Sequence, residues 1–239
     1  MAKKFLTLII FAMTFSCANA FADDDEKKGT YLNLSVSEST EVEEDLLIVN
    51  LRFEIEGKTS QDVQQEINKK MESALAEVKK QSKISVSTEN YSVYQYSPRT
   101  HKGEKRQTIW KGGQSIQLKG NNSMEILKTT GILQSMGLAV NGLSYVVSPE
   151  LSEETHDSLM EKSVEKVLNK AKRVAKVLGK DDIKVLNINV DSNGYYPSPI
   201  LMKSSDMMVK NTGAESVPVA SPGQSRISTT VNATILIKD

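Results

Sequence analysis

The feature that most constrains the fold is a long amphipathic stretch at residues 152–179. Ser152 is the expected N-cap of a helix, and Gly179 suits the left-handed position after its last turn. A helix of this length, about 40 Å, needs a large apolar surface to cover it, and a β-sheet provides one. Its apolar residues recur at spacings of three and four, on one stripe: Met160, Val164, Val167, Leu168, Ala171, Val174, Ala175 and Leu178.

Alternation of apolar and polar residues predicts strands on both sides of this helix. Strands are expected at residues 31–37, 45–56, 84–96, 109–119, 138–147, 183–190 and 224–237, and two more helices at 60–80 and 122–137. The order β-β-α-β-β-α-β-α-β-β mixes hairpins with helical crossovers. It predicts an α+β fold in which helices pack on one face of a largely antiparallel sheet.

Aromatic residues gather on the predicted hairpin of residues 84–119, as Tyr91, Tyr94, Tyr96 and Trp110. Exposed aromatic side chains on adjacent strands often mark a partner surface. Ordinary cross-strand packing is the alternative explanation. The pair Gly112-Gly113 in the return strand indicates a bulge or a close approach of backbones.

The N-terminus has the pattern of an export signal. Lys3 and Lys4 precede an apolar run at residues 5–15, and two small-x-small sites place cleavage after Ala20 or Ala22. The run is shorter than the ~20 residues that span a bilayer, so we expect no transmembrane segment in the mature protein. Lipidation of Cys17, which is the only cysteine, is the alternative.

This pattern divides the chain into a signal peptide at residues 1–20, a charged mobile tail at 21–29 and a single domain at 30–239. Within that domain, residues 191–223 hold four prolines and form a predicted loop or arm. The arm contains Met202, Met207 and Met208. Thioethers suit Cu(I) and oxidise reversibly, but methionine also serves on adaptable contact surfaces, which the neighbouring aliphatic residues favour.

Composition and motifs indicate no catalytic, cofactor or metal site. The formal net charge is zero and no basic run interleaves with aromatics, so a nucleic-acid partner is not expected. The two histidines, His101 and His156, lie on separate elements and are expected at the surface. No nucleophile elbow or phosphate loop occurs. Asp45 is interpreted as a turn residue that bonds local backbone.

Several stretches resemble the SIMPL-domain family, also called DUF541, of bacterial periplasmic or envelope proteins. The similar stretches are the opening strand followed by Asp45, Gly57-Lys58-Thr59 before the first helix, residues 84–93, and the helix end at 170–179. Glu38 departs from the family's usual glycine, and Lys111-Gly112-Gly113 from its aromatic strand start. The resemblance implies the fold and the compartment, and no catalytic motif.

We therefore expect a non-enzymatic, exported protein of the cell envelope, with a role in oxidative-stress tolerance and a periplasmic location. The aromatic hairpin and the arm predict a homo-oligomer, and a partner in the envelope is a further expectation. Two alternatives stay open: an enzyme with an unrecognised carboxylate site, and a methionine-based copper or oxidant buffer.

Overall fold

The structure is a computed structural model that describes residues 28–97, 108–191, 198–199 and 218–238. The predicted α+β class and order of elements are confirmed, with the two-residue β7 as an addition. The signal sequence, His101 and the three methionines of the arm lie outside the described residues. The elements are β1 (Gly29–Glu43), β2 (Leu46–Gly57), α1 (Ser60–Val78), β3 (Ser85–Tyr96), β4 (Ile109–Gly120), α2 (Ser123–Ser135), β5 (Ala139–Val146), α3 (Pro149–Val177), β6 (Ile183–Asp191), β7 (Ser198–Pro199) and β8 (Gln224–Lys238).

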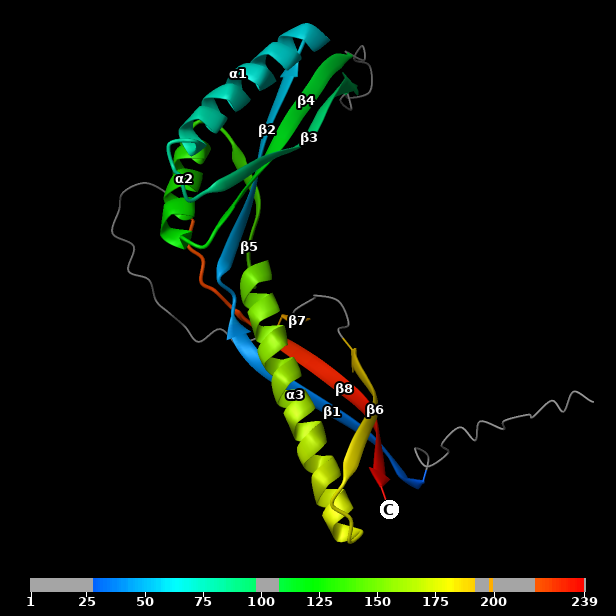
Figure 1. The fold of residues 1–239 in the computed structure, drawn as a ribbon. Helices are drawn as coiled ribbons and strands as arrows, with labels where there is room; N and C mark the ends of the chain where they lie inside the picture. Colours follow the sequence, from blue (N-terminus) through cyan, green and yellow to red (C-terminus); the bar gives the residue numbers. More distant parts are fainter. Residues whose placement is uncertain (1–27, 98–107, 192–197, 200–217, 239) are drawn as a thin grey trace, which may run out of the picture.

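The strands form two antiparallel sheets, a division that the strand patterns did not predict. One sheet has the order β3-β4-β2-β5, and the other has the order β1-β8-β6 with β7 also on β8. Helices α1 and α2 cover one face of the first sheet, and α3 covers one face of the second (Figure 1). We call each sheet together with its covering helices a layer. The two layers lie end to end and give an elongated molecule (Figure 1). Consecutive strands β1 and β2 therefore belong to different sheets.

The core of the first layer lies between α1, α2 and the sheet. Thr59 caps α1 by accepting a hydrogen bond from the N–H of Asp62 at 3.1 Å. The buried stripe of the helix then packs on alternate residues of β2 and β4: Val63, Ile67, Met71, Ala74 and Val78 against Leu47, Val49, Leu51, Ile116 and Leu118. A Cβ at Gly112 would come within 2.7 Å of Val63, so this glycine permits the close approach of α1 to the sheet.

Helix α3 forms the core of the second layer. Val167 and Ala171 are fully buried against Val36, Val231 and Ile235 of the sheet. The predicted C-terminal signal is confirmed, because Gly179 has φ +71° just after the helix.

The expected N-cap of α3 was wrong. The helix begins at Pro149 and its cap is Ser148, whose hydroxyl accepts from the N–H of Leu151 at 3.2 Å. Proline suits the first helical position, where no N–H is needed, and this extends the helix by a turn beyond Ser152. Ser152 is instead buried on the inner face of the helix.

The chain crosses between the two layers at Glu44 and Asp45. The N–H of Glu44 donates to the carbonyl of Gly223, and the hydroxyl of Ser225 donates to the Glu44 carboxylate at 2.8 Å. Asp45 accepts hydrogen bonds from the N–H and the hydroxyl of Ser148, at 2.7 and 2.8 Å. The interpretation of Asp45 as a residue that bonds local backbone was therefore wrong: it ties the start of β2 to the start of α3, 103 residues away.

Candidate functional site

The predicted aromatic cluster lies on β3 and β4, and the register separates its members. Strand β3 is an edge of its sheet, and Tyr91, Tyr94 and Tyr96 are 47%, 47% and 39% exposed. Tyr94 and Tyr96 pair opposite Lys111 and Ile109, which places both on the face away from α1. Tyr91 pairs opposite Gln114 on the other face. Trp110 packs partly against the core, so the strongly exposed aromatic residues here are the three tyrosines.

Charged side chains lie beside these tyrosines on the open face of the same sheet. The guanidinium of Arg52 lies 2.7 Å from the Glu54 carboxylate, and the ammonium of Lys111 lies 3.4 Å from it. Lys111 also lies 5.9 Å from the ring centre of Tyr96. The hydrogen bond from Arg52 lowers the pKa of Glu54, with partial burial opposing it and Lys111 adding to it. The Glu54 carboxylate in turn raises the pKa of Lys111.

These shifts stabilise the ionised forms of both groups. A general acid or base needs a pKa moved toward neutrality, and both shifts move away from it. The charged groups therefore form ion pairs across β2 and β4, and neither pKa shift favours proton transfer near neutral pH.

The remaining candidate for acid–base chemistry, His156, has a structural contact. Its Nδ1 lies 3.1 Å from the hydroxyl of Thr229 on β8, and the side chain is half-buried between α3 and the sheet. The expectation of a solvated surface residue was wrong for this histidine. In the described part of the chain, no group of three or more His, Cys, Asp or Glu side chains is arranged to hold a metal ion.

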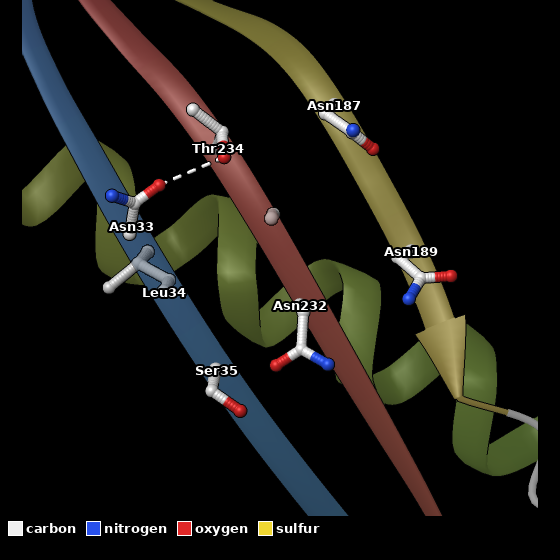
Figure 2. Close-up of a pocket in the computed structure, with 8 residues that line it drawn as sticks. Asn33, Leu34, Ser35, Asn187, Asn189, Asn232 and Thr234 are labelled. Atoms are coloured by element: carbon white, nitrogen blue, oxygen red, sulfur yellow. Dashed lines mark hydrogen bonds between the residues drawn. The ribbon is translucent and has the colours of Figure 1, made fainter.

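The second sheet has a very different open face. Side chains of β1, β8 and β6 that point away from α3 line a shallow depression of about 320 Å³ (Figure 2). The polar side chains that line it are Asn33, Ser35, Asn187, Asn189, Asn232 and Thr234, and we call this set the amide grid. The hydroxyl of Thr234 donates to the Oδ1 of Asn33 at 2.9 Å (Figure 2).

The register arranges the amide grid in rows across the three strands. One row is Asn33–Thr234–Asn187, and the next is Ser35–Asn232–Asn189. Asn33 and Ser35 alternate with apolar residues within the predicted strand at residues 31–37, but this alternation alone does not identify a site. The sequence shows Asn, Ser and Thr at alternate positions in each of the three strands. It does not show that these strands are neighbours in the sheet.

A scan against protein-family models matches residues 32–235 to the family described as SIMPL, protein of unknown function (DUF541). No curated protein matches the chain. In the part that the structure describes, no helix is both long and apolar enough to cross a membrane.

Proposed function

The chain belongs to the SIMPL family (DUF541), whose function is unknown, and on that premise we propose that it is an exported, non-catalytic protein of the cell envelope that acts by self-assembly. The export signal in the first 22 residues supports a periplasmic location. The resemblance to envelope proteins supports a role in oxidative-stress tolerance. The assembly is proposed to be a homo-oligomer formed through β3.

One observation carries the proposal of assembly: β3 is a 12-residue edge strand that displays three exposed tyrosines. Its outer side pairs with no other strand in the described residues. An unpaired edge offers N–H and C=O groups to another strand, so a long edge is a template for pairing. Tyrosine is enriched at protein interfaces because its ring is apolar and its hydroxyl still forms hydrogen bonds.

Antiparallel pairing of β3 with β3 of a second copy satisfies both strands at once. The two copies are then related by a two-fold axis, which gives a closed, self-complementary interface. In the proposed dimer one continuous sheet contains the four strands of each copy. Without Lys3 and Lys4 the exported chain has 28 Lys and Arg against 30 Asp and Glu, and this small formal net charge of −2 leaves little overall repulsion between copies.

Light scattering tests the proposal on the exported protein. We expect an oligomer for the wild type, and a shift to the monomer when Tyr91→Lys and Tyr94→Lys place charge on the β3 edge. Tyr31→Lys is the matched control, because Tyr31 is also an exposed tyrosine on an edge strand, β1, of the other sheet. A monomeric wild type refutes assembly. An oligomer that the β3 variant retains moves the interface elsewhere.

Two further measurements separate the remaining parts of the proposal. Deletion of residues 197–217 tests the predicted role of the arm. An oligomer that keeps the same number of copies after the deletion shows that the arm is not part of the interface. Mass spectrometry of the periplasmic protein should give a chain that begins at Phe21 or Asp23. A chain that still begins at Met1, or that carries lipid on Cys17, contradicts the proposed processing.

A further inference from the structure

We propose that the amide grid is a binding site for a neutral glycan chain. The site lies on the sheet of β1, β8 and β6, on the face that α3 does not cover (Figure 2). It is separate from the β3 edge, which belongs to the other sheet. The proposal is therefore independent of self-assembly, and each can fail without the other.

The first argument is the chemistry of the lining. A glycan presents hydroxyl groups that both donate and accept hydrogen bonds. Each asparagine carboxamide offers two donors and an acceptor, and each hydroxyl side chain offers both roles. Neighbouring strands are about 4.8 Å apart and alternate residues about 6.8 Å apart, so the amide grid presents these groups at regular intervals over a surface that several sugar rings can cover.

The second argument is that the polar side chains are available. Asn187, Asn189 and Asn232 are exposed, and in the described residues their carboxamides form no hydrogen bond with another side chain. In contrast, Asn50 on the open face of the other sheet accepts a hydrogen bond from Gln117 at 3.1 Å. Apart from the hydrogen bond between Thr234 and Asn33, the side chains of the amide grid can therefore bind a ligand without first breaking bonds to one another.

The third argument is charge. No side chain that lines the depression is ionised, although a quarter of the residues in the whole chain are charged. The open face of the other sheet shows the usual pattern, with Arg52, Glu54 and Lys111 in ion pairs. The lining itself offers no compensating charge to phosphates, nucleic acids or acidic peptides. Charged residues on the same face, Lys184 and Asp191, pair opposite Leu236 and Thr230 in the rows beyond the amide grid.

The fourth argument is an aromatic residue at the end of the site. Tyr31 is 52% exposed and precedes Asn33 by two positions on β1, so it points to the same face. Its ring provides a flat apolar plate next to hydrogen-bonding groups, which matches the apolar face and the hydroxyl edge of a pyranose ring. The volume of about 320 Å³ is at the small end of ligand pockets, which suits one or two rings with the rest of a chain lying across the sheet.

The test is an NMR titration of the full exported protein with two neutral probes, maltotetraose and the tetramer of N-acetylglucosamine. The two probes distinguish a plain hexose chain from one that carries acetamido groups. We expect changes in the amide signals of β1, β8 and β6 and affinity in the millimolar range, which is common for a shallow polar site. Signals of β3 should stay unchanged.

Variants locate the binding. Asn232→Ala, at the centre of the amide grid, should weaken the affinity about tenfold, or ~1.4 kcal/mol, and Tyr31→Ala should weaken it as well. Asn141→Ala is the matched control, because Asn141 is an exposed asparagine on β5 of the other sheet, and it should change nothing. Light scattering of each variant should give the mass of the wild type, and its NMR spectrum should show that the variant is folded.

Three outcomes overturn the proposal. The first is that neither probe changes the signals of β1, β8 or β6. The second is that binding survives both Asn232→Ala and Tyr31→Ala in the folded protein. The third is that an acidic polymer, polygalacturonate, binds the same face more tightly than the neutral probes, since a neutral site gives it no advantage.

Discussion

Substitution of Asp45 tests the connection between the two layers. Asp45→Ala removes a carboxylate that accepts hydrogen bonds from the N–H and the hydroxyl of Ser148, and a third from the amide of Asn121 at 2.8 Å. Ser148 is only 3% exposed, so water cannot replace the lost acceptor without a local rearrangement. The same serine caps α3, and its position therefore depends on Asp45.

The magnitude follows from these contacts. A hydrogen bond to a charged acceptor contributes about 1.5–3 kcal/mol, and a buried N–H left without a partner costs about 1–3 kcal/mol. The contributions are not additive, because two of the bonds come from one residue. We expect Asp45→Ala to lower the free energy of unfolding by about 3 kcal/mol, a large part of the ~5–15 kcal/mol typical of a folded protein. Asp45→Asn keeps one acceptor oxygen and should cost about half as much.

Urea denaturation followed by circular dichroism measures this loss. A double-mutant cycle with Ser148→Ala should give a coupling energy of about 1–2 kcal/mol. Asp181→Ala is the control, because Asp181 is exposed and forms no hydrogen bond in the described residues. A loss below about 0.5 kcal/mol for Asp45→Ala, or a coupling energy near zero, would refute the role of this contact.

Three further predictions concern stability. Ala171→Leu should cost about 1–3 kcal/mol by overpacking the fully buried seam between α3 and its sheet; an unchanged melting curve would place this face in solvent. Ser163→Ala should stabilise by about 1 kcal/mol, because the buried Ser163 hydroxyl has no hydrogen-bond partner among the described residues; a loss of stability would contradict this. The folded-state pKa of Glu54 is lowered, chiefly by Arg52. Ionised Glu54 therefore stabilises the folded protein above its ordinary pKa, and this stabilisation is lost as the pH falls through the folded-state value. Glu54→Gln should therefore be less stable than the wild type at neutral pH by less than about 1 kcal/mol, and the difference should vanish in acid; a constant difference would contradict this.

Local chemistry made much of the fold predictable. Thr59 and Gly179 act through groups within a few residues in the chain, so their roles in starting and ending helices could be read from the sequence. The start of α3 was misplaced because two serines compete there. Ser148 is followed by Pro149 at the first helical position, and this combination outweighs Ser152.

Partners distant in the sequence made the rest unpredictable. Alternation shows which residues of a strand share a face but not which strand lies beside it. β1 pairs with β8, almost 200 residues later, although β2 follows it directly. The amide grid and the separation of Tyr91 from Tyr94 both depend on such pairings, so neither could be found from a single strand.

Cysteine cross-linking along β3 tests the proposed self-assembly most directly. Cys17 is the only cysteine, so a Cys17→Ser background allows single cysteines to be placed at Ser85, Ser87 and Ser92, with Ser144 on the opposite edge strand β5 as the control. A disulfide needs Cα atoms about 4.4–6.8 Å apart. Only a cysteine near the two-fold axis can therefore form a disulfide with the same cysteine of the second copy. We predict a covalent dimer that is strongest at one β3 position and absent for Ser144→Cys. Equal cross-linking at every position including Ser144, or none at any β3 position, would contradict pairing through the β3 edge.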